Sequence, residues 1–349
     1  MMSDLKANES RALFKKVCVI GAGIMGSGIA AHFANSGIEC LLLDVVPKDS
    51  NGASRNDLAH MGIQKSLKAK PAAFFSKKYA TMIEAGNLED DLHKVKNCDW
   101  VIEAVVENAG IKQELFAKLE SNVAKNTIVS SNTSGLSINE MLKGRTQDFK
   151  ERFLVTHFFN PVRYLHLLEL VKGPDTKDAV VKKIAQFGEQ TLGKGIVYGK
   201  DTPNFVANRI GVFAMMEIMR VMQEDGLSIE EVDAVFGPAT GRPKSAVFRT
   251  ADLVGLDTFI HVANNCYENL PNDERREVFK VPAFLSKMVE NGWLGQKSKQ
   301  GFYKKQEKDI LALDYKSLTY NPKQKVRYDS LGAVRNLETV GEKIKFLVN

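Results

Sequence analysis

KVCVIGAGIMGSGIAAHFANSGIECLLLD, residues 16–44, is the segment from which the architecture can be inferred. Its first five residues form an apolar run of strand length, and the glycine pattern GxGxxG follows at 21–26. The spacing then predicts a helix at 27–36, which ends at Gly37, and a second strand at 39–43. A strand, a glycine turn, a helix and a second strand in this order form a right-handed βαβ unit. We therefore predict that a parallel sheet begins here.

The glycine turn has the spacing of a dinucleotide-binding site. Gly21 permits a tight turn, Gly23 lets the backbone approach a pyrophosphate, and Gly26 lets the helix pack closely so that its first amides point at phosphate. Asp44 follows eighteen residues after Gly26, and its carboxylate can accept both ribose hydroxyls while it would repel a 2′-phosphate. The alternative is a tight turn in an unrelated α/β domain. We expect NAD rather than NADP, bound by Gly21, Ala22, Gly23, Ile24, Met25, Gly26 and Asp44.

Further apolar runs continue the α/β pattern after the first unit. They lie at 100–106, 127–129 and 153–159, and helical segments separate them. A lysine-rich stretch at 53–86, interrupted by Pro71, is predicted to be helical. This alternation is typical of a doubly wound, mostly parallel sheet that is covered by helices.

A change of character after residue 200 predicts a domain boundary. Thr202 is a plausible N-cap and Pro203 a first-turn residue of a long helix, and the sequence that follows predicts helices without strands. We expect an α/β domain at 1–200 and a smaller all-α domain at 201–306. Residues 307–349 are Lys-rich and weakly patterned, which indicates a linker or tail that could lead to further domains.

A histidine and a glutamate lie on neighbouring predicted strands. His157 is near the end of the run at 153–159, and Glu169 is in the next apolar run, at 164–171. A carboxylate bound to one ring nitrogen fixes the tautomer and stabilises the imidazolium that forms when the other nitrogen takes a proton. The alternative on this segment alone is a core histidine with a satisfied hydrogen bond beside a surface glutamate.

Polar residues follow the ends of five predicted strands. Because ligands bind beyond the carboxyl ends of parallel strands, these residues are expected at one edge of the sheet. Ser134 could hold a substrate oxygen near the nicotinamide, or it could be a turn serine ahead of a helix. Asn208, in the first turns of the next domain, either faces solvent or reaches across the cleft between the domains. The strand-end residues are Gly21, Asp44, Glu107, the run 131–134 and His157.

The composition is that of a soluble globular protein. The chain has 349 residues, 44% of them hydrophobic and 26% charged, which favours two domains. A net charge of +6 with scattered lysines argues weakly for an anionic small molecule and against nucleic acid. The four cysteines have no metal-ligand spacing, no apolar run approaches the ~18 residues of a membrane span, and the first sixteen residues lack a signal core. We expect a cytoplasmic protein without a bound metal or a membrane span.

Eight segments together resemble the L-3-hydroxyacyl-CoA dehydrogenases over about residues 16–304. The resemblance is greatest to the version that is fused to an enoyl-CoA hydratase in bacterial fatty-acid oxidation proteins. It implies a Rossmann-type domain followed by a helical domain. The segments are GxGxMGxGIA at 21–30, EAVVEN at 103–108, SNTS at 131–134, HFFNP at 157–161, Glu169, KDTPNFVANR at 200–209, LVGLDT at 253–258 and GFY at 301–303.

The resemblance also implies roles for individual residues. His157 matches the catalytic base and Glu169 its orienting acid, and Ser134 and Asn208 match residues that hold the reacting oxygen. Further matches surround the nicotinamide, at Glu107, Lys112, Asn160 and Lys297. Ser66 matches a CoA contact, and Lys70 is our choice for the CoA-binding lysine. The helical domain matches the family's homodimer surface.

The implied reaction is NAD-dependent oxidation of an L-3-hydroxyacyl-CoA to the 3-ketoacyl-CoA in fatty-acid β-oxidation. Two departures concern the helical domain: Asn204 stands where glycine is usual, and 241–246 replaces a common proline-rich segment. The alternatives are a related hydroxy-acid or sugar-acid dehydrogenase that acts without CoA, and a structural NAD-binding module without turnover.

Overall fold

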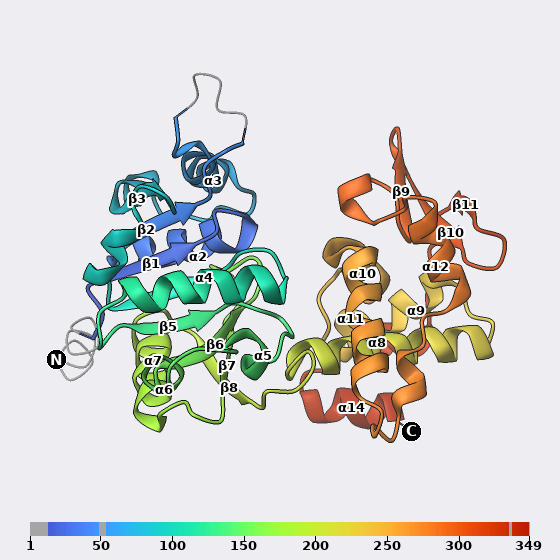
Figure 1. Ribbon diagram of the computed structural model, residues 1–349. Coiled ribbons are helices and arrows are strands. Elements are labelled where there is room, and N and C mark those ends of the chain that lie inside the picture. The colour runs from blue at the N-terminus through green and yellow to red at the C-terminus, as the bar shows by residue number, and fades with distance from the viewer. Residues whose placement is uncertain (1–12, 49–53, 335–336, 349) are drawn as a thin grey trace. The chain divides into compact units, whose positions relative to one another are not determined.

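The computed structural model describes residues 13–48, 54–334 and 337–348. It divides into two compact units, Met1–Val206 and Ala207–Asn349, six residues later than the boundary expected at 200 (Figure 1). Most of the N-terminal segment in which we expected no signal sequence lies outside the described residues. Among the residues that are described, no helix combines the length and apolar character that a bilayer crossing requires.

The N-terminal unit is built on an eight-stranded sheet with the order β3-β2-β1-β4-β5-β6-β7-β8. Neighbouring strands are parallel except β6 and β7, which are antiparallel. The strand order changes direction between β1 and β4, which is the switch point where such sheets bind dinucleotides. The strands are β1 (Lys16–Ile20), β2 (Glu39–Asp44), β3 (Ile83–Asn87), β4 (Trp100–Glu103), β5 (Ile128–Ser131), β6 (Phe153–Phe158), β7 (Leu167–Lys172) and β8 (Gly195–Gly199).

Helices cover both faces of this sheet, as predicted for a doubly wound fold (Figure 1). On β1, Val17 and Val19 face the side covered by α2 and α7, whereas Cys18 and Ile20 face the side covered by α4, α5 and α6. Both faces are therefore buried, which explains the continuous apolar runs of the sequence. The helices are α2 (Ile24–Asn35), α3 (Asp57–Lys68), α4 (Ala109–Asn122), α5 (Ile138–Met141), α6 (Gln147–Glu151) and α7 (Asp178–Gln190), with 3₁₀ turns η1 (Lys77–Met82) and η2 (Leu92–Asn97).

The stretch expected to be helical at 53–86 is only partly so. Its described part contains α3 and η1, but Ile83–Asn87 forms the edge strand β3 beside β2. The prediction was wrong there because β3 is short and carries only one β-branched residue, Ile83, so no strand pattern is visible.

The C-terminal unit is mostly helical. Its core is formed by side chains of five of the helices, from α8 to α12, and of two strands of a small antiparallel sheet, β11-β10-β9. The helices are α8 (Ala207–Glu224), α9 (Ile229–Val235), α10 (Phe248–Val254), α11 (Leu256–Asn269), α12 (Ala283–Glu290), α13 (Asp329–Val334) and α14 (Val340–Val348), with 3₁₀ turns η3 (Pro238–Thr240), η4 (Arg276–Phe279) and η5 (Gln296–Ser298). The strands are β9 (Tyr303–Gln306), β10 (Asp309–Asp314) and β11 (Thr319–Pro322).

The small sheet corrects the expectation of an all-helical domain ending at 306 and a linker beyond it. Ala312, Leu313 and Tyr315 are buried in the same core as the helices. Residues 307–322 therefore belong to the folded unit. Their pattern was weak because burial along β10 does not alternate and β11 has no buried residue.

The first helix of this unit begins later than predicted. Helix α8 starts at Ala207, and Thr202 and Pro203 lie in a turn before it. Asn204 and Phe205 have φ of 59° and 48°, a left-handed backbone that cannot continue a right-handed helix. Asparagine tolerates this conformation better than most residues, which explains how it replaces the usual glycine at 204.

Candidate active site

The glycine turn between β1 and α2 has the shape that a pyrophosphate needs. Gly21 has φ of 101°, and a Cβ added there would lie 2.5 Å from the carbonyl oxygen of Ala104. A Cβ on Gly26 would lie 1.7 Å from the Gly21 carbonyl oxygen. A Cβ on Gly23, by contrast, would meet no atom of the described residues within 4 Å. The space above the first turn of α2 is open, so the turn fits a bound dinucleotide.

Asp44 lies beside this turn at the end of β2. Its Oδ2 accepts the backbone N–H of Ala22 at 2.6 Å, and its Oδ1 accepts the N–H of Val45 at 2.7 Å. Two backbone donors therefore hold the carboxylate in place. Each oxygen keeps a lone pair for a ribose hydroxyl, as expected for an NAD site.

His157 and Glu169 are direct partners on the antiparallel strands β6 and β7. The imidazole Nδ1 lies 2.7 Å from Glu169 Oε2, and the side chain of Glu169 is fully buried. The other carboxylate oxygen, Oε1, accepts the backbone N–H of Val206 at 3.1 Å. The strand register brings the two residues together, and the Val206 amide fixes the orientation of the carboxylate.

This pair determines the tautomer of the imidazole. An ionised carboxylate can only accept, so Nδ1 carries the proton and Nε2 presents a lone pair. Within the described residues Nε2 makes no hydrogen bond, and it is not among the buried side-chain atoms that lack a partner. Nε2 is therefore not fully enclosed, although His157 as a whole is only 6% exposed, and it can accept a proton from a bound molecule. His157 is buried and hydrogen-bonded as in the alternative, but Glu169 is fully buried and is not the surface glutamate that the alternative requires.

A buried ion pair supports the neighbouring strand ends. Lys112, on α4, is buried and places its Nζ 2.6 Å from Glu103 Oε1 and 3.3 Å from Glu107 Oε2. Glu107 Oε1 in turn accepts the backbone N–H of Ser134 at 3.0 Å and the hydroxyl of Thr133. The structure thus brings three predicted site residues, Glu107, Lys112 and Ser134, into one network.

Glu103 was not among the predicted site residues. It closes strand β4, is fully buried, and accepts the hydroxyl of Ser131 at 2.5 Å through its second oxygen. A buried carboxylate needs a charge partner and donors, and Lys112 with Ser131 supplies them. The signal in the sequence was a charged residue at the end of the apolar run WVIE.

A cavity of about 340 Å³ lies next to the glycine turn. Its lining includes Gly23 and three residues that were predicted from different parts of the sequence: Ser66, Lys70 and Asn160. Lys65 and Arg163 line it as well and were not predicted. Three cationic side chains beside a phosphate-binding turn make this cavity suited to a second phosphorylated group.

A buried lysine holds the loop between β6 and β7, which carries Asn160. Lys194 Nζ donates to the carbonyl oxygens of Val162 at 2.5 Å and of Leu165 at 2.7 Å. Burial lowers the pKa of Lys194 to about 8. The loop therefore depends on a donor whose charged form is disfavoured by its surroundings.

Two of the predicted residues lie in the C-terminal unit. Asn208 is the second residue of α8 and is half-buried. Lys297 is in η5, is exposed, and forms an ion pair with Asp257. Their roles at the reaction site stay predictions.

Two family models match consecutive parts of the chain. Residues 16–202 match the NAD-binding domain of 3-hydroxyacyl-CoA dehydrogenase, and residues 205–305 match the C-terminal domain of the same family. The relative from Bacillus subtilis, named a probable 3-hydroxyacyl-CoA dehydrogenase, is 47% identical over 96% of this chain. A relative of the same name from Deinococcus radiodurans is 49% identical over 88% of this chain.

Solved structures with the same architecture support these matches. FadB2 of M. tuberculosis has a TM-score of 0.71 with 31% identity, over 84% of this chain and 99% of its own. The (S)-3-hydroxybutyryl-CoA dehydrogenase PaaH1 of Ralstonia eutropha has a TM-score of 0.68 with 29% identity, over 82% of this chain and 98% of its own. The share of the relatives covered varies, since the chain spans 44% of the B. subtilis protein and 87% of the D. radiodurans protein.

Proposed function

The chain belongs to the 3-hydroxyacyl-CoA dehydrogenase family, and from that premise we propose that it catalyses the reversible NAD-dependent oxidation of an L-3-hydroxyacyl-CoA to the 3-ketoacyl-CoA, as in fatty-acid β-oxidation. One observation carries this proposal. The imidazole of His157, held by Glu169, presents an accessible Nε2 at the same sheet edge as the glycine turn.

His157 acts as the general base in the oxidation. Its Nε2 takes the proton of the substrate's 3-hydroxyl group, while bound NAD⁺ supplies the hydride acceptor for the hydrogen on C3. The carboxylate of Glu169 stabilises the imidazolium that results, because it lies 2.7 Å from Nδ1. In the reverse direction Nε2–H returns the proton to the ketone oxygen.

Ser134 and Asn208 are proposed to bind the oxygen that loses its proton. The network of Glu107 and Lys112 supports this role for Ser134, because it fixes the Ser134 backbone N–H at 3.0 Å from Glu107 Oε1. Asn160 and Lys297 are proposed to contact the nicotinamide half of NAD.

The cavity lined by Ser66 and Lys70 is the proposed site for CoA phosphates. Its position beside the glycine turn and the additional cations Lys65 and Arg163 support this assignment. Arg163 is positioned for the role, because its guanidinium donates to the carbonyl oxygens of Ala72 and Phe74 at 2.9 and 3.0 Å.

His157→Gln tests the proposal directly. Loss of the base should lower turnover of acetoacetyl-CoA with NADH by about 10²–10⁴, while the affinity for NADH changes little. His166→Gln is the matched control, because His166 is exposed and lies on the connection between the same two strands. Turnover of the His157 variant within about threefold of wild type would contradict the assignment.

Two comparisons separate the alternatives. Equal turnover of free acetoacetate and acetoacetyl-CoA would favour a hydroxy-acid dehydrogenase that acts without CoA. Binding of NADH without its consumption on any 3-ketoacyl-CoA would favour a structural module. The Nε2 of His157, unpaired within the described residues, supports catalysis over the structural module, and the cations around Ser66 and Lys70 support a CoA substrate over a free acid.

We also propose a homodimer through the helical unit, a cytoplasmic location and association with an enoyl-CoA hydratase. Four buried free cysteines support a reducing compartment. A Rickettsia prowazekii relative, 36% identical over 89% of this chain, is named a putative fatty acid oxidation complex trifunctional enzyme, and the chain spans 44% of it. Light scattering of the chain with NADH bound tests the dimer.

A further inference from the structure

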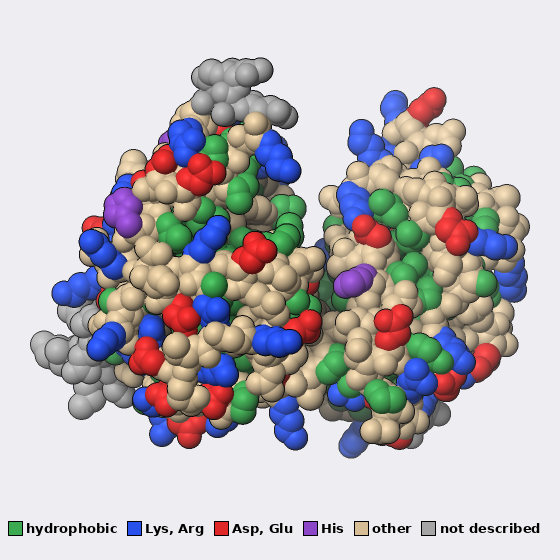
Figure 2. All heavy atoms as spheres, viewed as in Figure 1, with side chains coloured by type: hydrophobic (Ala, Val, Ile, Leu, Met, Phe, Trp, Pro, Cys, Tyr) green, Lys and Arg blue, Asp and Glu red, His purple; other side chains and the backbone are tan. Residues whose placement is uncertain are grey.

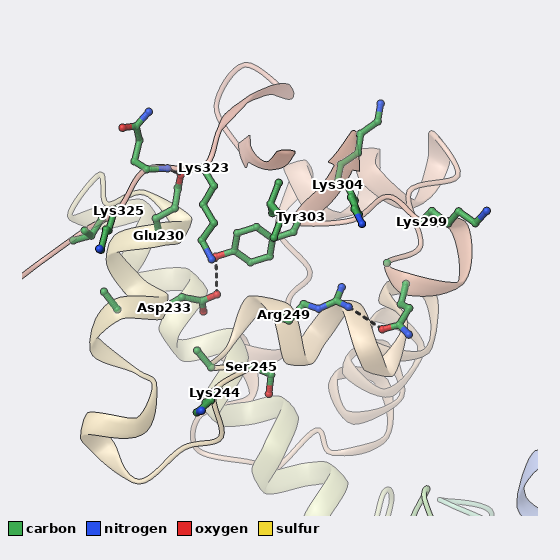
Figure 3. A pocket seen from close by; sticks show the side chains of 18 of the residues that line it. Glu230, Asp233, Lys244, Ser245, Arg249, Lys299, Tyr303, Lys304, Lys323 and Lys325 are labelled. Carbon is green, nitrogen blue, oxygen red and sulfur yellow. Dashed lines mark hydrogen bonds between the residues drawn. The ribbon is translucent and has the colours of Figure 1, made fainter. Parts of the chain in front are cut away.

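The C-terminal unit contains a cavity of about 850 Å³ between its helices and its small sheet. None of its lining residues has a role in the proposed reaction. Figure 3 shows its walls: Lys244 and Arg249 come from α10 and the segment before it, Tyr303 and Lys304 from β9, and Lys323 from the segment after β11. A volume of this size suits a small organic ligand.

The lining of this cavity is strongly basic. It contains seven cationic side chains and three carboxylates. Figure 2 shows lysine and arginine side chains gathered at the end of the unit that carries β9 to β11. Among the residues that the structure describes, none of the seven cations forms an ion pair, although Arg209, Arg220 and Lys297 elsewhere in the unit each do. The cavity therefore presents a positive potential that a bound anion would relieve.

Two of the three carboxylates in the wall are engaged by other groups. Asp233 Oδ1 accepts the backbone N–H groups of Val247 and Phe248 at 2.9 and 3.0 Å, and its Oδ2 accepts the hydroxyl of Tyr303 at 2.7 Å. Glu230 accepts the N–H of Gln324 at 3.1 Å. These carboxylates hold helix α10, β9 and the segment after β11 together, and within the described residues neither forms an ion pair with one of the seven cations.

Two of the cations are held in place. Lys323 Nζ lies over the ring of Tyr303, 4.7 Å from its centre. Figure 3 shows the two side chains side by side. One guanidinium nitrogen of Arg249 donates to Gln296 at 2.9 Å, which leaves its other N–H groups for a ligand. A held arginine with surrounding lysines matches phosphate oxygens in both charge and geometry.

We propose that this cavity binds a small organic polyphosphate of nucleotide size. Several phosphates in one compact ligand supply the negative charge that the cations lack, and the Ala234, Ala246 and Ile310 side chains in the lining leave room for an organic group. All of its lining residues belong to the C-terminal unit, and the proposal is that this second ligand binds while NAD is bound.

Calorimetric titration of the full chain, kept saturated with NAD⁺ at low salt, tests this inference. ATP and inorganic tripolyphosphate are the two probes. Binding of one ATP per chain supports the proposal if the cavity variants below weaken it, since the cavity lined by Ser66 and Lys70 also offers cations to phosphate. If tripolyphosphate binds as well, the phosphates suffice, and if only ATP binds, the nucleoside contributes. If neither probe binds to the NAD-saturated chain, the proposal is wrong.

Variants connect the binding to the cavity. Lys304→Gln with Lys323→Gln should weaken ATP binding by at least about tenfold, because two charge-assisted contacts are lost. The control, Lys287→Gln with Lys308→Gln, removes the same charge from exposed residues outside the cavity and should change the affinity by less than about twofold. Equal weakening by both pairs would overturn the proposal.

Two further measurements show whether a loss of ATP binding comes from the cavity itself, from misfolding or from a change in the dehydrogenase reaction. Lys304→Arg with Lys323→Arg should restore ATP affinity, and Lys244→Gln, on an exposed segment, tests the same cavity if the double variant does not fold. Turnover of acetoacetyl-CoA should be unchanged in all of these variants. A failure of the dehydrogenase proposal would appear there, whereas a failure of the polyphosphate proposal would appear only in the titration.

Discussion

Replacing Glu169 by glutamine keeps the size of the side chain but removes its charge and one of its acceptors. Glu169 is fully buried, and the hydrogen bonds that it accepts include those from His157 Nδ1 at 2.7 Å and from the Val206 N–H at 3.1 Å. Glutamine has one oxygen, so its amide group must face one of these two donors. If it faces the imidazole, the ring adopts the other tautomer and Nε2 no longer accepts a proton.

The expected loss follows from the charge-assisted bond. Such a bond contributes about 1.5–3 kcal/mol, and it is strongest when the imidazole becomes charged in the transition state. That corresponds to a decrease of kcat by roughly 10- to 160-fold. The effect is smaller than that of removing the base itself, because the imidazole is still present.

Steady-state oxidation of NADH with acetoacetyl-CoA gives kcat, and a fluorescence titration gives the affinity for NADH. We expect kcat to fall while the NADH dissociation constant stays within about twofold of wild type, since Glu169 does not line the glycine turn. Glu114→Gln, an exposed glutamate on α4, is the matched control. A decrease of kcat below about threefold in a folded Glu169→Gln protein would refute the reasoning.

Three other predictions concern the site and its supports. Gly23→Ala should raise the NADH dissociation constant at least about tenfold without lowering the melting temperature. Gly26→Ala should lower the melting temperature, because a Cβ at residue 26 would lie 1.7 Å from a backbone oxygen, and equal melting temperatures of the two variants would contradict this. Lys112→Met leaves the carboxylate of Glu103 buried without its cation and should lower the free energy of unfolding by about 3–5 kcal/mol in urea, and a loss below about 1 kcal/mol would count against the buried pair. Burial lowers the pKa of Lys194 from 10.5 to about 8. Between these two pH values the folded state binds fewer protons than the unfolded state, so the free energy of unfolding rises with pH. Between pH 7 and 10 the wild type should therefore gain about 2 kcal/mol relative to Lys194→Met, and no gain in urea denaturation would show that the lysine is not buried as a cation.

Local patterns predicted the first half of the fold well. The glycine turn, the helix after it and Asp44 lie within thirty residues of each other and were predicted correctly. Turn geometry and burial on both faces of the sheet constrain the residue type at each of these positions. The sequence also predicted His157 and Glu169 on neighbouring strands. In the structure the second strand returns antiparallel to the first, and its register places the two residues opposite each other.

Features that depend on tertiary contacts were missed. The sequence predicted a linker where β10 and β11 lie. Ala312 and Leu313 are buried against helices far away in the sequence, and this burial produces no strand periodicity in the local sequence. The start of α8 was placed too early, because a threonine–proline pair usually opens a helix and the left-handed backbone at Asn204 has no signal of its own. Glu103 was overlooked since its partner, Lys112, becomes visible only in three dimensions.

The pairing of β6 with β7 has a consequence for how this protein can change. The proton acceptor, the acid behind it and the amide that anchors the acid all come from residues up to Val206. Exchanges and insertions beyond that point replace none of these three groups. The proposed base and its supporting groups are therefore inherited together with the sheet, whereas the helical unit can diverge without replacing any of them.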